Sequence, residues 1–207
     1  MVAGPTPARV EHYLHMFELL EDAEWCVGES LGWTVVQPHH GRVTVGEVVG
    51  RLRGDPDAMT TCRPADVRWE DDLVYLEQRG DAVIILEYAG NSAEEDALKR
   101  LSQGAAVHGV YWGINNVNRL FYWVDGIAVT ELDTLCPEHT WGRDPEALAD
   151  HLDALRELHD PSSQGYDRGA EWDWPTAMAT VESLTGLRLD ADWFRRPQLC
   201  ATVPSGA

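Results

Sequence analysis

Residues 104–132, GAAVHGVYWGINNVNRLFYWVDGIAVTEL, form the most aromatic stretch of the chain and predict three consecutive β-strands. Residues 105–114 are apolar on both alternating faces, a pattern typical of a strand covered on both sides. Residues 119–124 and 127–132 flank Asp125-Gly126, a strong hairpin signal because both central residues of such a turn need a positive φ. Three strands with short connections predict the centre of an antiparallel sheet.

The remaining chain adds helices and further strands around this centre. Residues 8–22 and 175–185 carry apolar side chains at helical spacing, and Gly186 ends the second of these predicted helices. Residues 24–36 and the segments on either side of the Arg79-Gly80 turn predict strands. The first seven residues and the tail 197–207 are expected to be loose. We therefore predict an α+β fold, a single domain with a largely antiparallel central sheet covered by helices.

Three helix starts are marked by capping residues. Thr44 with Glu47, and Ser92 with Glu95, match the capping box, in which the two side chains bond reciprocally to the backbone. Asp144-Pro145 predicts another helix start, because proline is favoured at the first helical position. The apolar stripe expected on that helix consists of Leu148, Leu152, Leu155 and Leu158.

Charge and cysteine usage limit the classes of partner and location. The chain has 35 acidic and 16 basic residues, a formal net charge of −19. This charge excludes nucleic-acid backbones and anionic membranes as partners, because both would be repelled, and it permits a basic partner or a cation. The chain shows no signal peptide, no transmembrane-length segment and no paired CxxC motif. We therefore expect a cytoplasmic protein with reduced thiols.

Several motifs follow one another in a recognisable order. They are LxxLSxG at 98–104, VYWxxN at 110–115, an aromatic strand ending in Asp-Gly at 121–126, and WGxDPxAL at 141–148. This order resembles an uncharacterised actinobacterial family of domains of unknown function, over most of residues 24–194. The resemblance implies no activity, cofactor or site residue. A composition rich in Ala, Arg, Gly and Val, with Lys99 as the single lysine, is also typical of a GC-rich bacterial genome.

Common catalytic and metal-binding signatures are absent from the sequence. There is no GxSxG, HExxH or glycine-rich phosphate loop, so we predict no catalytic residue, metal or cofactor. Cys136 and His139 have a metal-ligand spacing but lack two further ligands, and the intervening proline favours a loop. His108 lies in a strand expected to be buried, where a hydrogen-bonded core histidine is more common than a catalytic base.

Two functional hypotheses remain open. The first is a non-catalytic, acidic binding protein, an accessory or immunity-like factor that captures a basic protein partner through Glu131, Asp133, Trp172 and Trp174. The alternative is a small-molecule-binding protein or enzyme with its pocket at the end of the central strands. Its aromatic walls would be Tyr111, Trp112, Tyr122 and Trp123. Its polar groups would be His108, Asn115, Asn118 and Arg119.

Overall fold

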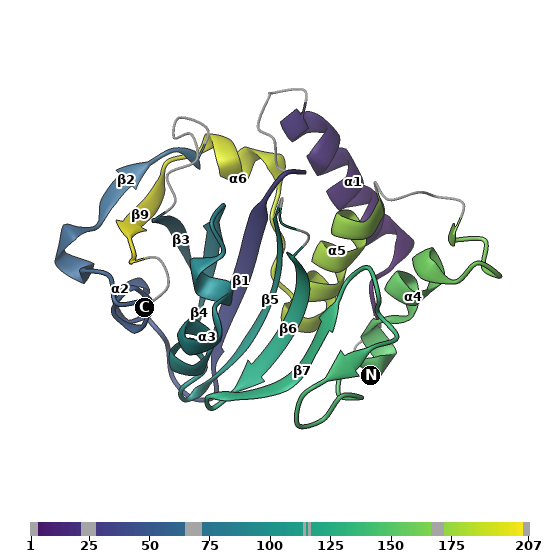
Figure 1. Ribbon diagram of the computed structural model, residues 1–207. Helices are drawn as coiled ribbons and strands as arrows, with labels where there is room; N and C mark the ends of the chain where they lie inside the picture. Colours follow the sequence, from purple (N-terminus) through teal and green to yellow (C-terminus); the bar gives the residue numbers. More distant parts are fainter. Residues whose placement is uncertain are drawn as a thin grey trace.

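The computed structural model describes residues 4–21, 28–64, 72–113, 115, 117–166 and 172–204 (Figure 1). In these residues one antiparallel sheet of nine strands has the order β2-β9-β3-β4-β1-β5-β6-β7-β8. The strands are β1 (Leu31–Pro38), β2 (Thr60–Cys62), β3 (Leu73–Arg79), β4 (Ala82–Glu87), β5 (Ala105–Gly113), β6 (Val117–Val124), β7 (Ile127–Asp133), β8 (Thr140–Trp141) and β9 (Gln198–Thr202). The α+β fold with an antiparallel sheet, predicted from the sequence, is therefore confirmed.

Helices cover both faces of this sheet. They are α1 (Pro7–Glu21), α2 (Val45–Arg51), α3 (Glu95–Leu101), α4 (Asp153–His159), α5 (Asp173–Thr185) and α6 (Ala191–Arg195), with short 3-10 turns η1 (Pro56–Ala58), η3 (Asn91–Ala93) and η4 (Ala149–His151). Figure 1 shows α2 and α3 on one side of the sheet and α1 and α5 on the other. None of the helices in the described ranges is long and apolar enough to cross a membrane.

The central strands agree with their prediction. β5 contributes Val107 to the core under α2 and α3, and Val110 to the core under α1 and α5, so it is covered on both faces. Asp125 and Gly126 have φ values of 49° and 78° and connect β6 to β7 as the predicted hairpin. Local turn chemistry and strand alternation are sufficient to specify this part of the fold.

Of the two predicted capping boxes, only one forms. Thr44 accepts the Glu47 amide at 3.2 Å, and the Glu47 carboxylate accepts the Thr44 amide at 2.7 Å at the start of α2. The box at Ser92 and Glu95 is wrong. The Ser92 hydroxyl is 3.0 Å from that of Thr34, and α3 begins after Glu94 without a side-chain cap. A tertiary contact therefore takes the hydroxyl that would have capped the helix.

The helix predicted to begin at Asp144-Pro145 is also wrong in extent. Two short helical segments, η4 and α4, replace it and begin only at Ala149 and Asp153. The leucine stripe nevertheless lies in the core, each of its members being at most 7 % exposed. Burial of the stripe was predictable from its spacing, whereas the continuity of the helix was not.

The C-terminal tail corrects two further expectations. Residues expected to be loose contain β9, which pairs with β2 on one side and β3 on the other. Cys200 on β9 forms a disulfide with Cys62 on β2, so the expectation of reduced thiols is wrong for this pair. Cys136 is free and exposed, and Cys26 lies outside the described residues. The chain end thus becomes an inner strand of the sheet.

Candidate functional site

The sheet separates the residues that were predicted to line one site, because successive side chains on a strand point to opposite faces. Those on the face covered by α1 and α5 are His108, Trp112, Asn118 and Tyr122. Those on the face covered by α2 and α3 are Tyr111, Arg119, Trp123, Glu131 and Asp133. A pocket walled by Tyr111 and Trp112 together does not form, because the sheet itself lies between them.

Glu131 is a buried carboxylate with a full set of donors. Its side chain accepts from Arg119 at 2.9 Å, from the Trp141 indole at 3.2 Å and from the Trp123 indole. The residue is only 5 % exposed. A buried ion pair with such partners organises the sheet edge, and it is not available to a basic protein in solution.

The other residues predicted to face a partner also have internal contacts. The Trp174 ring stacks on that of Trp112, with centroids 5.0 Å apart and an interplanar angle of 6°. Trp172 packs partly buried against the core beneath α1 and α5. The Asp133 carboxylate accepts the Leu135 amide at 2.9 Å. Asn115 is exposed in the turn between β5 and β6, where one residue on each side lies outside the described part of the chain.

His108 is held in the core as a neutral imidazole. Its ring stacks on Tyr122 at a centroid distance of 4.4 Å, and its Nδ1 atom is buried without a hydrogen-bond partner. Burial lowers the pKa of His108 to about 4, with a smaller contribution from His151. A side chain that is neutral at pH 7 and lies 7 % exposed is a core group in this structure.

The cysteine and histidine spacing at residues 136–139 belongs to a turn. The His139 amide donates to the Cys136 carbonyl at 3.0 Å, and both side chains are exposed. Across the part of the chain that the structure describes, no three His, Cys, Asp or Glu side chains gather closely enough to hold a metal ion.

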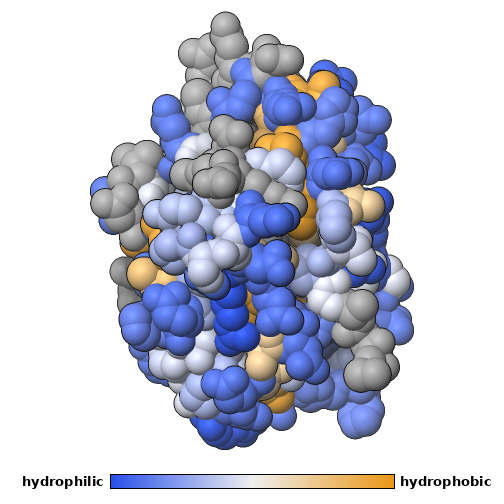
Figure 2. Space-filling model, turned by 90° about the vertical axis from the view of Figure 1, so that its right-hand side faces the viewer, coloured by the Kyte–Doolittle hydropathy of each residue, from blue (hydrophilic) through white to orange (hydrophobic). Residues whose placement is uncertain are grey.

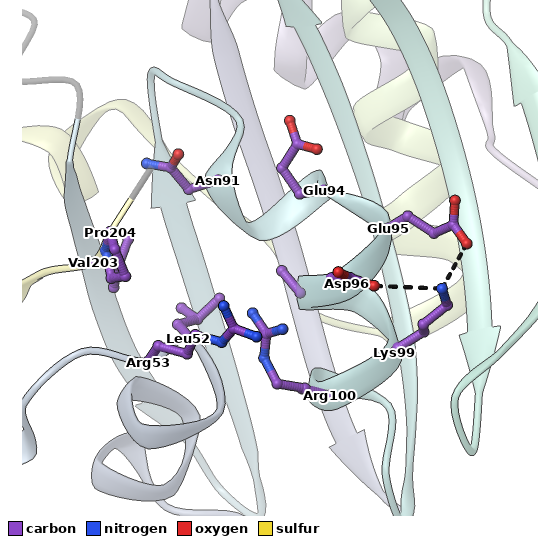
Figure 3. A pocket seen from close by; sticks show the side chains of 11 residues that line it. Leu52, Arg53, Asn91, Glu94, Glu95, Asp96, Lys99, Arg100, Val203 and Pro204 are labelled. Atoms are coloured by element: carbon purple, nitrogen blue, oxygen red, sulfur yellow. Dashed lines mark hydrogen bonds and ion pairs between the residues drawn. The ribbon is translucent and has the colours of Figure 1, made fainter. Parts of the chain in front are cut away.

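A cavity of about 360 Å³ that sequence reasoning did not find lies between the end of α2, η3, α3 and the segment after β9. Figure 3 shows Arg53 and Arg100 side by side at one end and Asn91 and Glu94 at the other, with Val203 and Pro204 forming a wall. Two further cavities, of about 220 and 270 Å³, lie beside α6 and α4. The arginine that lines the first of these, Arg195, forms an ion pair with Asp192, and the residues that line the second include no arginine.

The backbone at Arg53 adopts a conformation that favours glycine. Its φ is 65°, and the Arg53 and Gly54 amides donate to the Gly50 and Val49 carbonyls as in a Schellman motif. The left-handed position of that motif is usually glycine, because a side chain there costs about 1 kcal/mol or more. The residues at positions 53 and 54 cannot be swapped, because a Cβ at position 54 would lie 2.9 Å from the Thr202 carbonyl oxygen. The fold thus retains an arginine where backbone energetics favours glycine.

The two guanidinium groups share the end of the cavity without a carboxylate between them. Arg100 donates through Nε to the Arg51 carbonyl at 2.6 Å, which fixes its direction. Burial lowers the pKa of the Arg100 guanidinium, the like charge of Arg53 lowers it further, and the carboxylate of Asp96 acts in the opposite direction with a smaller effect. Within the described residues, neither side chain forms an ion pair, and the Arg53 guanidinium makes no hydrogen bond. This end of the cavity therefore concentrates positive charge.

Residues 73–206 match a family described as "Family of unknown function (DUF6461)". The chain belongs to this family. The match confirms the resemblance to an uncharacterised domain, but it begins at residue 73 instead of residue 24. The DUF6461 region includes Arg100 and Val203, whereas Arg53 precedes it. Comparisons with curated proteins and with solved structures gave no match.

Proposed function

We propose that the chain is a binding protein whose cavity between α2, α3 and the segment after β9 takes a small molecule with an anionic group. The observation that carries this proposal is the pair of guanidinium groups, Arg53 and Arg100, which lie side by side there, neither of them in an ion pair with a described residue. The cavity volume of about 360 Å³ lies in the range of small-molecule sites.

The chain has a surplus of carboxylates, yet neither guanidinium group of this pair is bound to one. Acidic residues outnumber basic ones by 35 to 16. Among the described residues, seven arginines form an ion pair with a carboxylate, whereas Arg53 and Arg100 do not. Two like charges placed together repel each other, and an anion bound between them would remove that repulsion. Guanidinium groups suit this role because their planar N–H donors match the oxygens of a carboxylate or phosphate.

The backbone strain at Arg53 supports the same proposal independently. Residues held in the left-handed region are concentrated at functional sites, where the side chain compensates for the cost. Arg53→Gly is therefore an informative variant, because glycine keeps the Schellman motif and removes only the side chain. Its stability should equal or exceed that of the natural chain by up to about 1 kcal/mol.

Thermal unfolding in phosphate tests the proposal. Inorganic phosphate at tenfold its Kd stabilises a native state by about 1.4 kcal/mol, which raises Tm by about 3–5 °C in a chain of this length. We expect this rise, relative to chloride at equal ionic strength, in the natural chain and not in Arg53→Gly. The matched control is Arg42→Gly, which removes the same charge from an exposed position outside the cavity.

The control also separates specific binding from the general stabilising effect of phosphate, which acts on any protein surface. Equal rises in the two variants and the natural chain would show a general effect and would contradict the proposal. Absence of any rise in the natural chain would contradict it as well.

A second candidate is the capture of a basic protein, which the acidic character of residues 138–160 favours. This stretch has seven exposed acidic residues, of which Asp153 and Glu157 lie in α4, and Figure 2 shows that hydrophilic residues dominate the side of the molecule that it draws. Native mass spectrometry of protein from its host should then show a basic polypeptide that is lost on Asp153→Lys with Glu157→Lys. A polypeptide retained by that double variant would contradict this second candidate.

Cytoplasmic location remains a prediction from cysteine usage and the lack of a signal peptide, and actinobacterial origin remains a prediction from the resemblance of the motifs. The Cys62–Cys200 disulfide is more typical of an oxidising compartment than of the cytoplasm. Alkylating free thiols at the moment of cell lysis therefore tests the location. A cytoplasmic protein should show both thiols trapped, and an intact disulfide in freshly lysed cells would contradict that location.

A further inference from the structure

We infer that the occupant of this cavity is zwitterionic, with its anionic group at Arg53 and Arg100 and an ammonium group at Glu94. This inference rests on the proposed function, because it concerns the same cavity, and it adds the second recognition group of the ligand. Figure 3 shows the guanidinium pair and Glu94 at opposite ends of the cavity.

The lining residues carry balanced charge, and the charges that lack an ion pair lie apart, Arg53 and Arg100 at one end and Glu94 at the other. Three cationic side chains and three carboxylates line the cavity, although the whole chain has a net charge of −19. The carboxylates lie at the start of α3, and Arg100 follows Glu94 by six positions, which corresponds to about 9 Å along the helix axis. A cavity that is neutral overall but dipolar complements a ligand that is itself neutral and dipolar.

One of the carboxylates is available to a ligand. Lys99 lies 2.7 Å from Glu95 and 3.4 Å from Asp96, so these two acids already have a cation. Glu94 is exposed, and its carboxylate has no hydrogen bond or ion pair with any described residue. Its charge also acts on a buried neighbour, since burial raises the pKa of Glu87 and the negative charge of Glu94 adds to that rise. An ammonium group beside Glu94 would offset this local excess of negative charge.

A ligand with a single charged group leaves part of the charge on the cavity lining without a counter-charge. A small dianion would satisfy Arg53 and Arg100 but would meet the unpaired Glu94 across the cavity, and a lone cation would meet the guanidinium pair. The lining of the cavity also includes apolar surface, so a hydrocarbon chain between the two charged groups has walls to pack against. That surface comes from Ala97, Val203 and Pro204.

The test compares 6-aminohexyl phosphate with hexyl phosphate by titration calorimetry at low ionic strength. The two probes differ only in the ammonium group. We expect the amine to bind about three- to fivefold more tightly, which is the range for a solvent-accessible ion pair. Glu94→Gln should reduce this ratio to about one and leave hexyl phosphate bound at least as well. Glu146→Gln, which removes an exposed carboxylate outside the cavity, should keep the ratio.

The outcomes separate this inference from the proposed function. If Arg53→Gly abolishes binding of both probes but the natural chain shows no preference for the amine, the anionic site stands and the zwitterionic ligand is refuted. If Arg53→Gly leaves both affinities unchanged, both proposals fail. A preference for the amine that survives Glu94→Gln also overturns the role given to Glu94.

Discussion

His108 makes the stability of the protein depend on pH over a window that the structure defines. In the folded state burial lowers the pKa of its imidazole to about 4, whereas the ordinary value of 6.5 applies to the unfolded chain. Between these values the unfolded chain binds a proton that the folded chain does not. The contribution of His108 to the free energy of unfolding is therefore fully present above about pH 6.5 and is lost as the pH falls toward 4.

The size of the effect follows from the same two values. The difference between a pKa of 6.5 and one of about 4 corresponds to about 3.4 kcal/mol, since each tenfold change in proton affinity corresponds to about 1.4 kcal/mol. This is a substantial part of the stability of an ordinary domain. His151, whose pKa burial also lowers, acts in the same direction as the pH falls below about 6.5.

His108→Phe isolates the contribution of this residue. Phenylalanine keeps an aromatic ring against Tyr122, cannot titrate and leaves no buried nitrogen without a partner. Urea unfolding followed by tryptophan fluorescence at pH 7, 6, 5 and 4.5 gives the free energy of unfolding of both proteins. The natural chain should lose about 2–3 kcal/mol more than the variant between pH 7 and 4.5.

Comparing how steeply the free energy of unfolding changes with pH in the two proteins removes most contributions from other residues. The carboxyls of Glu87 and Asp173, whose pKa burial raises, titrate in both proteins and cancel in the difference. Any loss or gain of packing at position 108 shifts the whole curve of the variant without changing its slope. Parallel pH curves for the two proteins would refute a buried, neutral His108.

Two further changes test the packing of the sheet. In Gly109→Ala the new Cβ would lie 2.5 Å from the Phe121 ring and 2.7 Å from the Trp33 carbonyl oxygen, so urea unfolding should show a loss of about 2–3 kcal/mol. The control Gly50→Ala has open space and lies within α2, so it should gain up to about 1 kcal/mol, and equal effects of the two would contradict this packing. Reducing the Cys62–Cys200 disulfide, which spans 138 residues of chain, should lower the free energy of unfolding by about 2–4 kcal/mol, and identical urea midpoints with and without reductant would contradict its role.

The elements that the sequence determined by itself are those specified by neighbouring residues. Asp125-Gly126 specifies its hairpin because few residue pairs adopt positive φ at both positions. Thr44 and Glu47 specify the start of α2 through reciprocal hydrogen bonds within four residues. Gly186 ends α5 in the left-handed conformation that glycine favours. In each case the decisive interaction is local.

The sequence alone was sufficient to exclude a pocket walled by both Tyr111 and Trp112. Tyr111 and Trp112 are neighbours on one predicted strand, and strand alternation places neighbours on opposite faces. A pocket that needs both was inconsistent with the strand that carried them. Glu131, by contrast, resembled an exposed acid in the sequence, and only its contacts with Arg119 and two indoles show that it is buried.

The cavity and the order of the sheet were decided by tertiary structure alone. β9 is too short and too polar in its flanks to be identified by pattern, yet its backbone is satisfied by pairing with β2 and β3. Arg53 follows the end of α2 and Arg100 lies in α3, far apart in the chain, and no sequence rule pairs them. They meet because α2 and α3 pack on the same face of the sheet. The sequence thus determines conformation where its interactions are local, and long-range packing decides which charges share a site.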